Sequence, residues 1–375
     1  MNHGIAQNPL ISVIIPLYQV HEYIEECLLS ILSQVSAPNY ELILIDDCGE
    51  DDTVDIALKF LSTVDNPPPY RLLHHEHNRG LSAARNSGAA VATGQYILFL
   101  DSDDCLFPHA LQQLFTAAID SRADVTIGAV KLTSPTDCCS RYFQLPKTGT
   151  FDGQAFLEAT ISGTIYTTAW NKLVRRDFLT KHHLEFTEGL LHEDELWSMQ
   201  LAFCRPSACL ITEPTYLYRN IREGSIMKNI TPAHLTSRAY ILSVISELPQ
   251  KYQIDPGPRF AQFLENRGNS WLWSGICTAY QQGVDLRSFS YTLASCATPD
   301  LRFWCRNSPH NRRLRQIGRR LSIWPIRLRQ WLLYRYLRKT MKKVCPAVQH
   351  LGTMQSLLLW FMAIPTLLLC SLSGT

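Results

Sequence analysis

Apolar runs alternate with mixed apolar and polar stretches over the first 130 residues of the chain. Short apolar runs bounded by polar or turn-forming residues are typical of buried strands. Five such runs occur, at Ile11–Pro16, Glu41–Ile45, Tyr70–His74, Tyr96–Leu100 and Asp124–Gly128. The stretches between them have helical patterns, near 21–34, 52–62, 80–92 and 108–120. Strands separated by helices predict an α/β fold with a mostly parallel sheet covered on both faces.

The pattern changes beyond residue 130. Pro, Thr, Ser and Gly recur through residues 131–165, which predicts a loop-rich insertion, and the chain becomes apolar and aromatic again over 166–220. We therefore expect three parts: an α/β domain over 1–230, a helical accessory region over 231–300, and a basic extension over 301–375.

Charge is distributed unevenly along the 375 residues, although the formal net charge is only +2. Of the 35 Lys and Arg residues, 14 lie in 301–375, a segment without Asp or Glu. Residues 1–300 therefore hold the other 21 basic residues and all 33 acidic residues. An acidic body with a basic tail suggests an anionic surface as partner.

The basic tail also has apolar residues at helical spacing, among them Leu314, Ile317, Leu321 and Trp324. Basic helices with Trp-rich apolar faces lie well on anionic membranes, so we expect 301–375 to bind a membrane surface. Packing against the preceding domain, a nucleic-acid patch or a protein-binding surface are the alternatives. The apolar run 357–370 is short for a span and favours an interfacial or re-entrant segment.

The twelve cysteines are scattered, without a CxxC pair, and the first residues carry no basic and apolar leader pattern. Reduced thiols in a cytoplasmic protein are the better interpretation. The ligand spacing of a zinc site is absent from the sequence.

Candidate chemistry gathers just after the predicted strands, at positions where ligands of open α/β sheets bind. Asp101, Asp103 and Asp104 follow the fourth strand, and three crowded carboxylates favour a divalent cation, although a solvated turn is the alternative. Asp46 and Asp47 follow the second strand, where an acid can accept hydrogen bonds from a base or ribose, or cap a helix.

Three further positions carry hypotheses of the same kind. Tyr18, after the strand that ends at Pro16, can stack on a nucleobase or pack at the sheet edge. Arg85, near a helix start, can bind phosphate or form a surface ion pair. Glu193 and Asp194 can supply a general base or begin a helix favourably.

Several ordered blocks of the chain resemble the family 2 glycosyltransferases, in particular the bacterial branch that builds lipopolysaccharide, capsule and exopolysaccharide. These blocks are Ile11–Tyr18, Leu28–Gln34, Glu41–Asp47, Asn78–Asn86, Gly94–Asp104, Ala169–Phe178, Glu193-Asp194, Tyr216–Arg219 and Gly224–Ile226. The resemblance covers roughly residues 10–228. One departure is Cys48-Gly49-Glu50, where the family usually has Gly-Ser after the paired acids.

The resemblance implies a GT-A fold, a nucleotide-diphosphate sugar donor, a divalent metal such as Mn²⁺ or Mg²⁺, and inversion at the anomeric carbon. It places Asp103 and Asp101 at the metal, and Asp194, next to Glu193, in the role of general base. The residues expected at the donor are Pro16, Tyr18, Asp46, Asp47, Arg85, Asp101 and Ser102.

The expected activity is sugar transfer to a cell-surface glycan or lipid-linked acceptor at the inner face of the cytoplasmic membrane. A second hypothesis is a catalytically inactive GT-A relative that acts as a binding or scaffold subunit, and the intact Asp101, Asp103 and Asp194 argue against it. A nucleic-acid-binding protein is a third, and it would leave these acids unexplained, so nucleic acid is not expected as a partner.

Overall fold

The computed structural model of the chain describes residues 9–134, 143, 145, 148–220, 232–264 and 266–268. Its strands are β1 (Ile11–Leu17), β2 (Tyr40–Asp46), β3 (Tyr70–His74), β4 (Tyr96–Phe99), β5 (Cys105–Leu106), β6 (Val125–Leu132), β7 (Gly149–Phe151), β8 (Lys172–Arg175) and β9 (Ala208–Tyr218). Its helices are α1 (Ile24–Leu32), α2 (Thr53–Ser62), α3 (Leu81–Val91), α4 (Ala110–Ser121), α6 (Gly153–Ile161), α7 (Arg176–His182), α8 (Glu193–Phe203) and α9 (Pro232–Tyr252).

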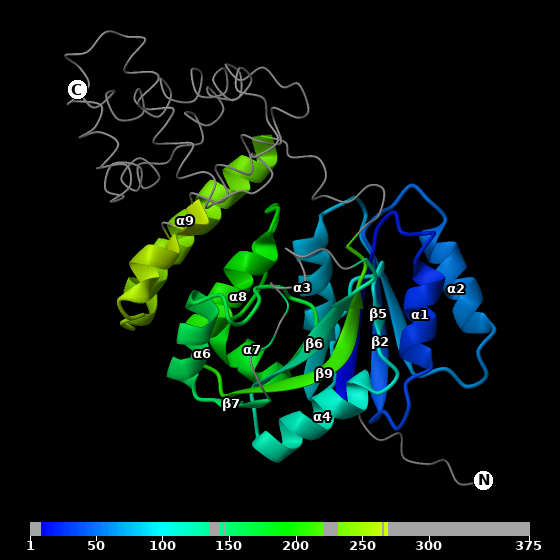
Figure 1. Cartoon of the computed structure of the whole chain (residues 1–375). Coiled ribbons are helices and arrows are strands. Elements are labelled where there is room, and N and C mark those ends of the chain that lie inside the picture. The colour runs from blue at the N-terminus through cyan, green and yellow to red at the C-terminus, as the bar shows by residue number, and fades with distance from the viewer. Residues whose placement is uncertain are drawn as a thin grey trace, which may run out of the picture. The chain divides into compact units, whose positions relative to one another are not determined.

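The strands form one mixed sheet with the order β3-β2-β1-β4-β8-β6-β9-β5, and β7 pairs with β9 (Figure 1). The first four strands in this order run parallel, and β8 is antiparallel to β4 and β6. The predicted α/β fold is confirmed, and all five expected strands are present. The predicted mostly parallel sheet is parallel over its first four strands and mixed beyond them.

The central strands are buried on both faces, which explains their nearly continuous apolar sequences. Helix α3 packs on β1 and β2, whereas α4 packs on β6 and β9 (Figure 1). The approach of α3 depends on Gly88, because a Cβ there would lie 2.5 Å from Cγ2 of Ile14. Gly94 is similarly constrained, since its Cβ would lie 2.6 Å from the Ser12 nitrogen.

The prediction of a loop-rich insertion over 131–165 is wrong in part, because 149–161 forms β7 and α6. Asp152 begins α6, and its carboxylate accepts hydrogen bonds from the N–H groups of Gln154 and Ala155. An Asp at this position is a strong helix-start signal. The frequent small and polar residues around it obscured this signal in the sequence.

The chain divides into two compact units, Met1–Ser225 with Glu247–Arg259, and Ile226–Ser246 with Phe260–Thr375. Helix α9 accounts for the described start of the region expected to be helical, and the expected basic tail 301–375 lies outside the described residues. Within the described parts, none of the helices is both long and apolar enough for a membrane span.

Candidate active site

The carboxyl ends of β1 to β4 lie at one edge of the sheet because these strands run parallel. Tyr18 directly follows β1 and is 43% exposed, Asp46 is the last residue of β2, and Asp101 lies just beyond β4. Pro16 is inside β1 and pairs with Ile45 of β2. The structure thus gathers at one edge the polar side chains that the sequence predicted to lie there.

Asp101, Asp103 and Asp104 form a tight group in the loop after β4. Each offers a carboxylate oxygen, and these oxygens all lie within 4.8 Å of one another. Asp101 and Asp103 are partly exposed, whereas Asp104 and the intervening Ser102 are buried. Three hard oxygen ligands so close together fit a divalent cation of the Mg²⁺ or Mn²⁺ type.

Asp104 is held in this group by β9 and the residue that follows it. The Tyr216 hydroxyl donates to Oδ2 of Asp104 at 2.8 Å, and the Arg219 N–H donates to Oδ1 at 2.7 Å. Burial raises the pKa of the Asp104 carboxyl well above its usual range, and the charges of Asp103 and Asp101 raise it further. Asp104 therefore anchors the loop, while Asp101 and Asp103 face the more open side.

Arg85 of α3 joins this loop to helix α8. Its guanidinium donates to Asp101 Oδ1 at 2.7 Å and to Glu193 Oε1 at 2.6 Å, and its side chain is only 2% exposed. Burial alone lowers the pKa of Arg85, but Asp101 and Glu193 outweigh it and raise the pKa above the ordinary value. The Phe186 ring, 5.3 Å from the guanidinium carbon, further fixes its position.

The first turn of α8 carries three consecutive acids, Glu193, Asp194 and Glu195. Glu193 is buried against Arg85, whereas Asp194 is partly exposed. Burial raises the pKa of the Asp194 carboxyl well above its usual range, and the charges of Glu193 and Glu195 raise it further. A carboxylate with a raised pKa binds a proton strongly, which is the property that a general base requires.

Asp46 and Asp47 are both engaged by neighbouring groups of the chain. Oδ2 of Asp46 lies 2.9 Å from Nδ1 of His74. Asp47 is buried, and its carboxylate accepts the N–H groups of Arg79 at 2.9 Å and Gly80 at 2.7 Å, directly before α3. Asp47 thereby fixes the start of the helix that carries Arg85.

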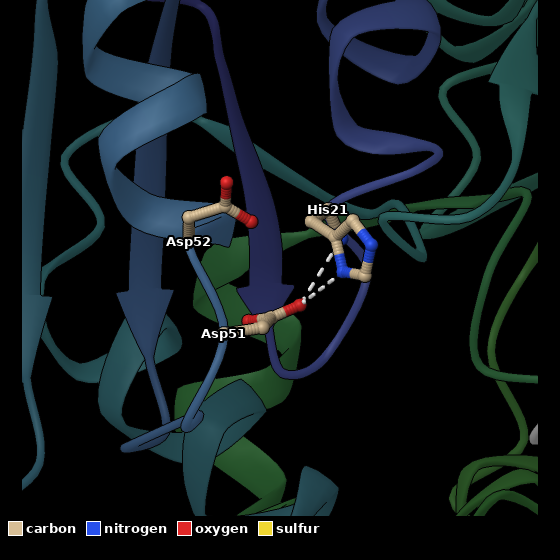
Figure 2. A group of neighbouring side chains, drawn as sticks. All are labelled: His21, Asp51 and Asp52. Atoms are coloured by element: carbon tan, nitrogen blue, oxygen red, sulfur yellow. Dashed lines mark hydrogen bonds and ion pairs between the residues drawn. The ribbon is translucent and has the colours of Figure 1, made fainter.

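Among the described residues, one other group has the composition of a cation site: His21, Asp51 and Asp52 (Figure 2). These side chains lie in the loops after β1 and β2. Oδ2 of Asp51 lies 2.9 Å from Nδ1 of His21 and accepts the Thr53 hydroxyl at 2.7 Å. The best-placed carboxylate of this group is thus already satisfied by donors of the chain.

The sequence did not assign roles to three residues that shape the site. Tyr216 and Arg219 support the acidic loop, and His75 connects Asp47 to Ser87, with its Nδ1 2.6 Å from Asp47 and its Nε2 2.9 Å from Ser87 Oγ. Tyr216 and Arg219 belong to a block that resembles the family, which was the only available signal. The His75 side chain is only 6% exposed, so this connection lies inside the protein.

The fold and this edge of acidic residues define a GT-A type α/β protein, and comparisons with known proteins agree. A model of the family "Glycosyl transferase family 2" matches residues 12–174. The uncharacterized glycosyltransferase YibD of Escherichia coli K12 is 28% identical over 342 residues, which cover 86% of this chain and 93% of that protein. The family match over residues 12–174 and the similarity to YibD indicate that the chain is a glycosyltransferase, and hence a transferase enzyme.

Solved structures with the same fold include TarS and a mannosyltransferase. TarS residues 1–349 of S. aureus, in complex with UDP-GlcNAc, superposes with a TM-score of 0.63 at 22% identity and covers 80% of this chain and 81% of that one. The mannosyltransferase PcManGT of Pyrobaculum calidifontis, in complex with GDP-Man and Mn²⁺, gives 0.53 at 15% identity and covers 96% and 88%. At these identities the likeness establishes the fold.

Proposed function

We propose that this enzyme transfers a sugar from a nucleotide-diphosphate sugar to a hydroxyl of a cell-surface glycan or lipid-linked acceptor, with inversion, in a single displacement. One observation carries the proposal. Arg85 binds both Asp101 of the acidic loop and Glu193 beside Asp194, so a candidate donor site and a candidate base belong to one bonded unit.

The nucleotide end of the donor is assigned to the loops after β1 and β2. Tyr18 offers an exposed ring for stacking on the base, and Asp46 keeps a partly exposed carboxylate beside it on the sheet edge. Asp47 contributes to the donor site indirectly, because its carboxylate accepts hydrogen bonds from two backbone N–H groups directly before α3. The solved complexes with UDP-GlcNAc and GDP-Man support a nucleotide sugar as donor without choosing the base.

Asp101 and Asp103 are the residues that would hold a divalent cation. Their carboxylates satisfy the ligand preference of Mg²⁺ and Mn²⁺, and Asp104 is withdrawn from that role by Tyr216 and Arg219. When bound, such an ion neutralises charge on the diphosphate leaving group. Mn²⁺ in the PcManGT complex supports this assignment.

Asp194 is proposed to take the proton of the attacking acceptor hydroxyl. A base in this position acts only when ionised, and its raised pKa then provides a strong driving force for proton uptake. Glu193 holds Arg85 at the same time, so it positions the base-bearing turn against the donor loop. Inversion follows if the hydroxyl attacks the sugar from the face opposite the diphosphate.

The decisive experiment separates binding from transfer. A screen of UDP- and GDP-sugars, with and without Mn²⁺, reads release of nucleoside diphosphate by the full chain. Asp194→Asn is expected to lower transfer by roughly 10²–10⁴-fold, the usual share of general base catalysis, while nucleotide affinity stays nearly unchanged. Normal transfer by this variant would remove Asp194 from the base role.

The proposed location rests on the sequence of the tail. The basic, Trp-containing pattern of 301–375 supports association with an anionic membrane at its cytoplasmic face. Sedimentation of the full chain with liposomes, with and without anionic lipid, tests this. Equal sedimentation with neutral lipid would contradict the electrostatic part of the proposal.

A further inference from the structure

Lys172, the first residue of β8, is a fully buried lysine at the side of the base-bearing helix. Its side chain is 1% exposed, and Nζ donates to the main-chain oxygens of Tyr166, at 3.0 Å, and Thr168. The ammonium also lies 4.4 Å from the centre of the Tyr166 ring. Burying a charge is costly unless it is hydrogen-bonded, and these carbonyl oxygens supply bonds that partly offset the cost.

The segment that Lys172 holds is joined to helix α8. The Thr168 oxygen that accepts from Lys172 also accepts from the Ser198 hydroxyl, at 3.3 Å. Ser198 lies one turn beyond Asp194 on α8. Lys172 thus reaches the helix of the proposed base through a single carbonyl group.

The acids in the first turn of α8 act on Lys172 through their charges. Of the three acids in its first turn, Glu193 is bonded to Arg85. Burial lowers the pKa of Lys172 to about 7, while the charges of Asp194 and Glu195 act in the opposite direction and favour its ammonium form. Because such coupling is reciprocal, the Lys172 charge favours the ionised form of Asp194.

We propose that Lys172 is a positioning residue for sugar transfer: its buried ammonium holds the Tyr166–Thr168 segment against α8 and keeps the Asp194 carboxylate available as a base. This inference rests on the proposed function for the identity of the base. The electrostatic coupling between Lys172 and Asp194, however, can be tested on the protein without any substrate.

The first test is an NMR titration of lysine side chains in the full chain, without metal or nucleotide. One lysine, absent from the spectrum of Lys172→Met, is expected to titrate near 7. In Asp194→Asn this titration should move to lower pH, because a negative charge that favours the ammonium is gone. A Lys172 titration at the ordinary lysine value, or one that Asp194→Asn leaves unchanged, would overturn the proposal.

The second test is the pH profile of turnover, with UDP-glucose, UDP-N-acetylglucosamine and GDP-mannose as probes and Mn²⁺ present. Lys172→Met should move the acidic limb of kcat to higher pH, so that the rate falls roughly tenfold at pH 6 for a one-unit shift and recovers near pH 9. The KM for the donor should stay the same. An equal loss at every pH would show a purely structural role and overturn the proposal.

Ser198→Ala is the matched control, because it removes the other donor to the Thr168 oxygen without changing charge. It should leave the midpoint of the acidic limb of kcat unchanged.

If Lys172→Met does not fold, Lys172→Gln keeps a donor without the charge and is expected to shift the same limb. If the wild type releases no nucleoside diphosphate from any probe, the proposed function fails, while the NMR titration still decides the placement of charge.

Discussion

Two groups of side chains in the described part of the chain have the composition of a cation site, yet they use their oxygens differently. In the loop after β4, Asp101, Asp103 and Asp104 crowd three carboxylates together. In the loops after β1 and β2, Asp51 is bonded to His21, and Asp52 lies beside them (Figure 2). Residue type and proximity alone would rank the two groups as equals.

The two groups differ in the charges that act on their titratable side chains. In the acidic loop, burial raises the pKa of Asp104, and the charges of Asp103 and Asp101 raise it further because the carboxylates repel one another. In the other group, the hydrogen bond that His21 donates to Asp51 raises the pKa of His21, so the group favours the imidazolium form and supplies its own cation. A metal relieves repulsion in the first case, whereas in the second it would have to displace bonds that already exist.

The largest expected effect is on metal-dependent donor binding, and it is expected when an acid is removed from the acidic loop but not from the other group. Asp103→Ala should weaken Mn²⁺-dependent donor binding by more than about 100-fold, since even outer-shell partners of a metal contribute 10–100-fold. Asp52→Ala, which removes an exposed acid at the start of α2, should leave it within about twofold. Isothermal titration with Mn²⁺ and UDP-sugars measures both. Equal losses in the two variants would show that the two groups do not differ in metal binding.

The support behind the acidic loop should have an intermediate effect. The buried Tyr216 hydroxyl donates to Asp104 and accepts the Asp101 N–H at 3.3 Å. Tyr216→Phe is therefore expected to lower the free energy of unfolding by about 1–3 kcal/mol, the cost of leaving a buried partner unsatisfied, and to weaken Mn²⁺ binding. Thermal and urea unfolding check the first part.

Tyr70→Phe provides the matched control, because Tyr70 is exposed at the start of β3. It should change stability by less than about 0.5 kcal/mol. If Tyr216→Phe behaved like this control, Asp104 would not depend on Tyr216 for its place.

The sequence was sufficient for the strands and for the edge at which the acids gather, because apolar runs and parallel pairing are local, periodic signals. It could not give the partners of Arg85. That side chain is bonded to Glu193, 108 positions away, and a bond over such a distance leaves no trace in the local pattern. The helix start indicates a phosphate contact for Arg85, and the fold adds two carboxylate partners that this local pattern does not reveal.

The same reason explains why the two cation-like groups look alike in the sequence. Asp51-Asp52 and Asp103-Asp104 are both paired acids after a strand. Only the fold brings His21 to Asp51 and Tyr216 to Asp104. The difference between a self-sufficient hydrogen-bonded pair and a repulsive group is thus a tertiary property.

The smallest expected effect is the titration of His21, and it sharpens the comparison most directly. His21 bonded to Asp51 should titrate above its ordinary value of 6.5, so the ion pair forms at low pH and is lost as the pH rises through the raised pKa. NMR of the imidazole resonances should show this in the wild type. In Asp51→Asn the titration should return toward 6.5, while Asp52→Asn should move it less, because Asp52 acts on His21 only through space. In the Asp103→Ala background, Mn²⁺ should leave the His21 resonances sharp, and selective broadening there would show that this second group binds the ion after all.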